Sequence, residues 1–317
     1  MVKIAVAGGS GNVAQEIIDA LAATNKHEIL LLSRKDVPNP DTASGVTWVK
    51  ANYEDPQKLA KTLHSIHTVL SFIDARLDVG NVSQRNLIDA AIQAGVKRFA
   101  PSEWASSSVE YLDWYRNKAK IREYLKELNK DHKVIEYCLF QPGLFVNYFT
   151  HPYNSTKHIN DLKLPLDFDN RRALVADDND VGKLTLTTVH DLASVVAQAV
   201  EYDGVWPEVG GIKGSELTIR QLIDIGEKVR GGPFAIERLK LDDLKAGKVK
   251  ASWMPKAAHR SFPEQQIEAL ATMVVSGLLL SFSAGAWNVT DEWNQLLPDH
   301  EFTQAEEFLA EAWNGKP

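Results

Sequence analysis

A glycine-rich segment near the N-terminus has the composition of a phosphate-binding turn. Residues 8–14 read Gly-Gly-Ser-Gly-Asn-Val-Ala, directly after the apolar run Val2–Ala7 and directly before a segment with helical periodicity. Glycine permits a tight turn and close approach of the backbone to a ligand, and the first amides of a helix favour an anion. This strand–turn–helix context predicts a dinucleotide pyrophosphate site formed by Gly8, Gly9, Ser10, Gly11, Asn12 and Val13.

The end of the second expected strand indicates which nicotinamide dinucleotide is bound. NAD-binding proteins usually place Asp or Glu at this point, where it bonds the ribose 2′-hydroxyl. This strand instead ends in Ser33-Arg34-Lys35. A hydroxyl and two cations suit a 2′-phosphate, which a guanidinium can bind through two parallel hydrogen bonds. We therefore predict NADPH as the cofactor, with Arg34 and Lys35 as its phosphate ligands; a solvated basic turn is the alternative.

A longer block carries a resemblance to a known family. Residues 87–104 read L-I-D-A-A-I-Q-A-G-V-K-R-F-A-P-S-E-W. This block resembles the isoflavone reductase-like and NmrA-like group of atypical short-chain dehydrogenases, whose pattern here is A-G-x-K-R-F-x-P-S-E-F. The resemblance continues at residues 8–14, 117–118, 141–149, 190–193 and 297–303, so it covers nearly the whole chain. The chain departs from the family pattern at Ala14, Asn52 and Trp104; we expect Trp104 to reshape the substrate pocket.

The resemblance implies a catalytic lysine. Family members that reduce their substrates carry a lysine on the helix after the fifth strand, and Lys118 matches it. A positioned ammonium can stabilise the negative charge that hydride addition creates and can assist proton transfer, and burial brings its pKa toward neutrality. A Tyr-x-x-x-Lys pair is absent because Trp114 occupies the tyrosine position. Tyr111 and Tyr115 are expected on roughly the same helical face as Lys118, with their roles open.

Further site residues follow from the resemblance and from their places at strand ends. Phe72 and Ile73 follow the fourth strand, and Ser102 and Glu103 follow the fifth. The carboxyl ends of parallel strands are where such folds bind ligands, so these residues are expected at the cofactor together with Lys118. The predicted substrate contacts are Trp104, Phe145, Asn147, Tyr148 and Phe149, for which ordinary aromatic packing is the alternative.

The elements that position these residues alternate between strand and helix periodicity. Strands are expected at residues 2–7, 28–33, 46–51, 68–73, 98–101 and 134–140. Helices are expected at 12–23, from about 55, at 79–95 and at 108–128. Such alternation predicts an α/β fold with a doubly wound parallel sheet of the Rossmann type.

The second half of the sequence lacks this regular alternation of strand and helix patterns. Residues 145–182 and 204–317 are predicted to form a smaller α+β substrate-binding part, beside a dinucleotide-binding domain of residues 1–144. Residues 183–203 are expected to rejoin that domain as a strand and helix. The uncharged segment 269–290 resembles a membrane span, but its Ser, Thr, Gly and Asn residues favour a buried helix followed by a turn.

Composition bounds the class of protein. The chain has 317 residues, is 44% hydrophobic and carries a net charge of −7, which indicates a globular protein and argues against nucleic acid as a partner. Its single cysteine, Cys138, lies in an apolar run and is predicted to be a buried hydrophobe. We expect a cytoplasmic monomer or homodimer. No motif predicts a metal site.

These observations predict an NADPH-dependent oxidoreductase that reduces a small aromatic or conjugated carbonyl, enone or benzylic ether. Two alternatives stay open. One is a regulatory sensor that binds NADPH without turnover, as NmrA-like members can. The other is a redox-neutral dehydratase or isomerase on the same fold.

Overall fold

The computed structural model describes residues 1–34, 45–160, 162–177, 182–255 and 264–317. Its central feature is a six-stranded parallel sheet with the strand order β3-β2-β1-β4-β5-β6. The strands are β1 (Val2–Ala7), β2 (His27–Ser33), β3 (Val46–Lys50), β4 (Thr68–Ser71), β5 (Arg98–Ala100) and β6 (Glu136–Tyr137). The order reverses between β1 and β4, the arrangement of a doubly wound dinucleotide-binding fold, so the predicted fold class is confirmed.

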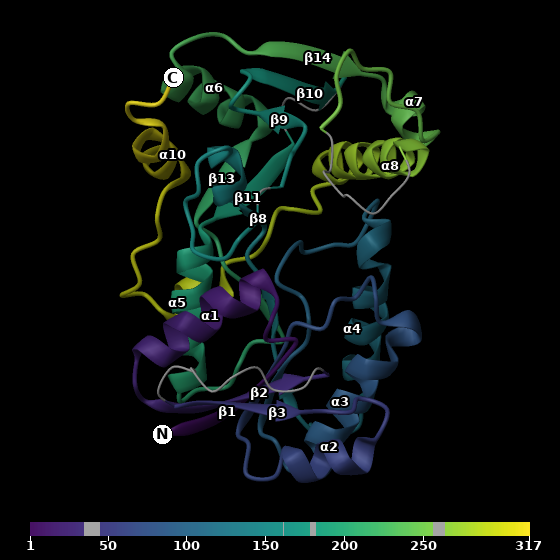
Figure 1. Cartoon of the computed structure of the whole chain (residues 1–317), viewed down its shortest axis with the longest axis vertical. Helices are drawn as coiled ribbons and strands as arrows, with labels where there is room; N and C mark the ends of the chain where they lie inside the picture. Colours follow the sequence, from purple (N-terminus) through teal and green to yellow (C-terminus); the bar gives the residue numbers. More distant parts are fainter. Residues whose placement is uncertain (35–44, 161, 178–181, 256–263) are drawn as a thin grey trace.

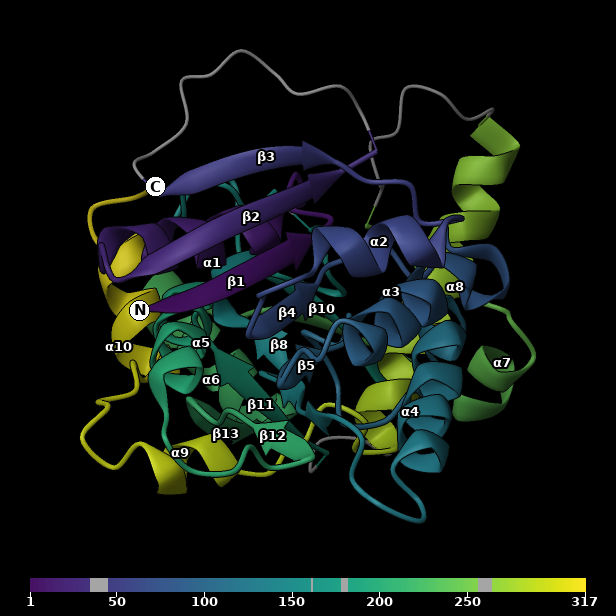
Figure 2. The same cartoon turned by 90° about the horizontal axis from the view of Figure 1, so that it is seen from below.

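Helices cover both faces of this sheet (Figure 2). On one face, α1 (Asn12–Ala23) packs against α5 (Val189–Glu201). The other face is covered by α2 (Pro56–Thr62), α3 (Val82–Gln93) and α4 (Arg116–Leu128).

Alternate side chains of β1 enter the two cores, because successive residues of a strand point to opposite faces. Ile4 and Val6 pack in the core with α1 and α5. Ala5 and Ala7 pack in the core with α2, α3 and α4. A strand segment buried on both faces has to be apolar, and residues 4–7 of β1 are apolar and buried, whereas Lys3 is only partly buried.

A second part lies above the central sheet and the helices α1 and α5 in the view of Figure 1. It contains two small sheets, β14-β10-β9 and β13-β11-β8. A third, β12-β7, follows β6 in the chain, and its residue Phe140 packs in the core with α1 and α5. Their strands are β7 (Leu139–Gln141), β8 (Leu144–Phe145), β9 (Leu166–Asp167), β10 (Arg172–Ala176), β11 (Lys183–Thr187), β12 (Val209–Gly211), β13 (Ser215–Thr218) and β14 (Ala235–Leu239). The helices are α6 (Ile219–Arg230), α7 (Leu241–Lys245), α8 (Glu264–Ser283), α9 (Glu292–Leu296) and α10 (Ala305–Trp313). Within the segment predicted to rejoin the first domain, α5 does pack on α1, whereas β11 belongs to one of these small sheets.

Two predicted elements are wrong in extent. The helix expected at 108–128 begins only at Arg116, after a short 3₁₀ turn at Asp113–Tyr115. At the predicted start of the helix, the Ser108 hydroxyl accepts a hydrogen bond from the Glu110 amide at 3.1 Å. Serine competes with helix formation through such bonds. Because Tyr111 lies before this turn at φ 61°, it does not share the helical face of Lys118.

The sixth strand is also shorter than predicted. It covers Glu136–Tyr137, after which the chain turns to pair β7 with β12. This pairing needs Gly210, because a Cβ there would lie 2.3 Å from the Cys138 sulfur and 2.5 Å from Trp293 Nε1. Cys138 itself is fully buried, as predicted, and burial raises the pKa of its thiol.

The segment that resembles a membrane span folds as expected. Residues 264–283 form α8, and a turn follows. Within the described ranges, every helix is too short or too polar to cross a bilayer.

Candidate active site

The glycine-rich turn is held tightly against the end of β4. Gly8 has φ 75°, and a Cβ at this position would lie 2.6 Å from the main-chain oxygen of Phe72. Only glycine meets both demands. Gly11 caps α1 without a side-chain hydrogen bond, so the first amides of the helix keep the donors that favour an anion. Ala14 is fully buried, which allows α1 to pack closely on the sheet.

A cavity of about 230 Å³ opens at this turn. Seven of the predicted cofactor residues line it: Gly8, Gly9, Ser10, Gly11, Arg34, Phe72 and Ile73. Asn12 and Val13 form the first turn of α1 beside it. Arg34 is exposed at the end of β2, while Lys35 lies outside the described residues.

Sequence reasoning missed several residues of this cavity. Trp48, Tyr53, Asp74, Leu77, Asp78 and Ser83 also line it. Asp74 directly follows Phe72 and Ile73 beyond β4, and a polar residue at the carboxyl end of a parallel strand was a signal that could have identified it. Asp74 forms an ion pair with Arg76 at 2.6 Å, which holds the pKa of its carboxyl below the usual range.

Lys118 is buried in the first turn of α4, with only 6% of its surface exposed. Its Nζ donates a hydrogen bond to the main-chain oxygen of Glu103 and lies 3.8 Å from the centre of the Tyr115 ring. Burial is the main cause that lowers the pKa of this amine to about 8. Arg122 and Arg76 lower the pKa further, and the carboxylates of Glu103 and Asp74 oppose them. The group is therefore mostly an ammonium at pH 7, with a proton that it can release.

The loop after β5 is fixed by hydrogen bonds to its neighbours. Gln84 is buried, and its side-chain oxygen accepts from the Ser102 amide at 2.8 Å and from the Ser71 hydroxyl at 2.9 Å. Gln84 thereby joins the ends of β4 and β5. The carboxylate of Glu103 is only 1% exposed and pairs with Arg122. Ser102 and Glu103 lie at the predicted strand end, but they do not line the glycine-rich cavity.

Trp104 is packed inside the protein. Its ring stacks between Phe72 and Phe140, with centroid distances of 4.4 and 5.4 Å. Its indole N–H donates to the Ser71 carbonyl at 2.8 Å. Trp104 was predicted to contact the substrate, yet it lines neither the glycine-rich cavity nor the cavity around Tyr148 and Trp253.

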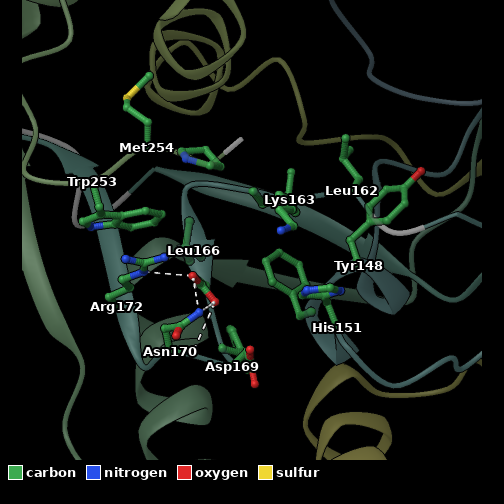
Figure 3. Close-up of a pocket in the computed structure, with 15 residues that line it drawn as sticks. Tyr148, His151, Leu162, Lys163, Leu166, Asp169, Asn170, Arg172, Trp253 and Met254 are labelled. Atoms are coloured by element: carbon green, nitrogen blue, oxygen red, sulfur yellow. Dashed lines mark hydrogen bonds and ion pairs between the residues drawn. The ribbon is translucent and has the colours of Figure 1, made fainter. Parts of the chain in front are cut away.

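A second cavity, of about 410 Å³, lies in the second part of the chain (Figure 3). Tyr148 and Phe149 line it, as do His151, Arg172 and Trp253. Figure 3 shows Tyr148 and His151 on one wall and Arg172 with Trp253 on the opposite wall.

The polar groups of this second cavity are partly paired. The guanidinium of Arg172 lies 4.0 Å from the centre of a Trp253 ring and donates to Asp167 at 2.9 Å. Asn170 also bonds Asp167, at 2.9 Å. The cavity thus combines flat aromatic surfaces with a small number of fixed polar groups, which is usual for small-molecule sites.

The other two predicted substrate residues have structural partners. The Asn147 side chain accepts from the Val189 amide at 2.9 Å and donates to the Ser155 hydroxyl at 3.2 Å. Phe145 is buried in the core with α1 and α5. Of this segment, Tyr148 and Phe149 therefore line a cavity. Asn147 and Phe145 line neither cavity and contact other parts of the protein instead.

Lys118 itself lines neither cavity, but it interacts with residues near both. Its ammonium interacts electrostatically with Asp74, which lines the glycine-rich cavity. The phenols of Tyr115 and Tyr148 interact in the same way, and Tyr148 lines the second cavity. Among the described residues, no three His, Cys, Asp or Glu side chains gather as metal ligands would.

Comparison with known proteins identifies the family to which this sequence and fold are similar. The sequence profile of the NmrA-like family matches residues 2–309. The chain is 30% identical to Oxidoreductase BOA1 of Botryotinia fuckeliana over 308 residues, which cover 95% of this chain and 97% of that protein. It is 22% identical to phenylcoumaran benzylic ether reductase IRL1 of Ginkgo biloba over 326 residues, 97% of each chain.

A solved structure shares the fold. The complex of leucoanthocyanidin reductase with NADPH from Vitis vinifera superposes with a TM-score of 0.69 at 20% identity, covering 98% of this chain and 99% of that one. The family profile and the full-length relatives agree with the resemblance that the sequence block 87–104 carries. This chain therefore belongs to the NmrA-like family.

Proposed function

We propose that this protein is an NADPH-dependent reductase of a small aromatic or conjugated carbonyl, enone or benzylic ether, with Lys118 assisting proton transfer. The observation that carries this proposal is the place of Lys118. Its buried ammonium interacts electrostatically with Asp74 of the glycine-rich cavity. It also lies over the ring of Tyr115, which interacts electrostatically with Tyr148 of the second, aromatic-walled cavity. Its relatives named as an oxidoreductase and as a benzylic ether reductase support the reaction class.

The first cavity fits a nicotinamide dinucleotide phosphate. The close approach of Gly8 to Phe72 leaves no room for a side chain at the turn, and the start of α1 carries unbonded amides suited to a pyrophosphate. Arg34, at the end of β2, is the proposed ligand of the 2′-phosphate, together with Lys35. The related leucoanthocyanidin reductase was solved with NADPH, which agrees with this choice of cofactor.

In the proposed reaction, the buried amine of Lys118 is the proton donor. The bound cofactor supplies a hydride to a carbon of the substrate. Lys118 would donate a hydrogen bond or a proton to the substrate oxygen on which negative charge develops. With a pKa of about 8, the amine carries this proton at pH 7. The main-chain oxygen of Glu103 and the ring of Tyr115 keep the ammonium in place while it acts.

The second cavity is the proposed substrate site. At about 410 Å³ it has the size of a small-molecule pocket. Tyr148 provides aromatic surface on one side and Trp253 on the other, and Phe149 also lines the cavity. This assigns cofactor binding to residues 1–144 with about 183–203, and substrate binding to residues 145–182 and 204–317.

A calorimetric titration tests the proposal. Wild type, Arg34→Ala and Arg116→Ala are each titrated with NADPH and with NADH; Arg116 is an exposed arginine on α4 and serves as the control. We expect NADPH to bind the more tightly. Arg34→Ala should weaken NADPH binding by roughly 10- to 100-fold, the value of a charge-assisted hydrogen-bonded pair, and leave NADH unchanged.

Two outcomes would change the assignment. If neither nucleotide binds wild type, both the reductase and the sensor hypotheses are wrong. If NADPH binds but a panel of carbonyl and enone compounds is never reduced, the protein fits the regulatory alternative. Product formed while NADPH is not consumed would indicate a redox-neutral reaction.

A further inference from the structure

One buried ion pair lies beside Lys118 and takes no part in either cavity. Arg122 donates to both carboxylate oxygens of Glu103, at 3.1 Å from Nε and 2.5 Å from Nη2. Glu103 is 1% exposed at its side chain and Arg122 is 21% exposed. Removing two charges from water costs desolvation free energy, which the attraction between the charges often does not repay. We therefore expect the pair to have a role other than stabilising the fold.

The pair acts on the same residue that holds the lysine. Glu103 uses its main-chain oxygen to accept from Lys118 and its carboxylate to accept from Arg122. Lys118 and Arg122 are four residues apart on α4, so both project from one face of the helix toward the loop after β5. Glu103 is therefore held between two cations of a single helix.

Arg122 also fixes the rest of this loop. Its Nη1 donates to the Ser107 carbonyl at 2.7 Å, and its Nη2 donates to the Ser106 carbonyl at 3.2 Å. On the other side, the Trp104 amide donates to the Phe140 carbonyl at 3.0 Å. The main-chain oxygen that holds Lys118 is thus anchored from both directions.

We propose that Glu103 and Arg122 are positioning residues for Lys118: together they fix the main-chain oxygen that holds its ammonium and place one charge of each sign beside it. The two charges act in opposite senses on the lysine. Glu103 favours the ammonium and Arg122 disfavours it, while Asp74, Arg76 and Tyr115 are the other charged or titratable groups that face it. This inference rests on the proposed role of Lys118.

The test measures the titration of Lys118 directly, without a cofactor. Protein labelled with ¹³C at the lysine Cε carbons is titrated by NMR between pH 6 and 11, and the Lys118 signal is assigned by its absence in Lys118→Met. We expect Arg122→Met to raise the midpoint by roughly one pH unit, and Glu103→Gln to lower it by roughly one. The double variant Glu103→Gln/Arg122→Met should return it close to the wild-type value.

Two controls separate this role from a structural one. Arg116→Met removes an exposed arginine from the same helix, and its midpoint should equal that of wild type. Arg122→Lys keeps the charge and should also keep the midpoint. If Arg122→Met does not fold, the shift in Glu103→Gln decides the question.

The proposal is overturned if folded Glu103→Gln and folded Arg122→Met both titrate like wild type, or if Arg116→Met shifts Lys118 as much as Arg122→Met does. Failure of wild type to bind NADPH would overturn the proposed function and would leave this titration unaffected, so the two failures are distinguishable.

Discussion

The ammonium nitrogen of Lys118 lies 3.8 Å from the centre of the Tyr115 ring. A cation above the face of an aromatic ring is attracted by the ring's electrons, and this attraction partly offsets the loss of hydration. Tyr115 therefore holds the ammonium through its ring rather than through its hydroxyl. The sequence placed the two residues on one helical face, whereas the structure defines how they interact.

Lys118→Met should abolish most of the turnover. The substitution keeps the length of the side chain but removes the proton donor, and loss of a general acid lowers kcat by about 100-fold or more. The affinity for NADPH, measured by calorimetry, should fall much less. Lys120→Met changes an exposed lysine on the same helix and should leave kcat as in wild type. Equal losses in both variants would contradict a specific role for Lys118.

The rate should fall as the pH rises through about 8. Because the ammonium is the active form and burial lowers the pKa of Lys118 to about 8, the proton donor is present below this pH and is lost above it. A profile of kcat/KM against pH reports the pKa of the free enzyme. A rate that stays constant up to pH 10 would show that the reaction needs no proton from Lys118.

The same pKa predicts how stability depends on pH. The amine has its ordinary pKa of 10.5 in the unfolded chain and about 8 in the folded protein, so the unfolded chain binds more protons between these values. The free energy of unfolding of wild type should therefore rise, relative to Lys118→Met, by about 3 kcal/mol from pH 8 to pH 10.5. Urea unfolding of both proteins at several pH values measures this difference. A constant difference across the window would mean that Lys118 is not desolvated in the folded state.

Gly8→Ala should remove cofactor binding through a clash with the end of β4. A Cβ at Gly8 lies 2.6 Å from the Phe72 oxygen, so the turn has to move, and φ 75° adds backbone strain. We expect NADPH affinity to fall by at least roughly tenfold, a free-energy change of about 1.4 kcal/mol. Gly95→Ala is the matched control: its φ is 73°, but nothing lies within 4 Å of the added Cβ. It should cost stability and leave NADPH binding intact.

Trp253→Ala should raise the KM of a substrate by roughly tenfold, because it removes an aromatic wall of the second cavity and the ring that Arg172 stacks on. Trp104→Phe is its counterpart. It keeps the stacking on Phe72 but loses the bond to Ser71, so it should lower the free energy of unfolding by about 1 kcal/mol and leave KM unchanged. Steady-state kinetics and thermal unfolding measure both effects. The reverse result would restore Trp104 as a substrate contact.

The sequence by itself determined the central sheet and its glycine-rich turn. Both depend on local information: a strand that is apolar on both faces, a helix with one apolar face, and glycine where φ is positive. The helix predicted from Asn12 to Ala23 has the same bounds in the structure. The family was also evident, because the block at residues 87–104 carries a specific pattern.

Only the tertiary structure decided the ends of elements and the environment of each side chain. Local periodicity could not show that Ser107 bonds to the chain near residue 287, or that β7 pairs with β12 where Gly210 closely approaches Cys138. It also could not show that Glu103 pairs with Arg122 rather than facing a cavity, or that Trp104 is enclosed between Phe72 and Phe140. These outcomes depend on contacts between residues far apart in the chain. A burial-dependent property such as the pKa of Lys118 exists only once those contacts have formed.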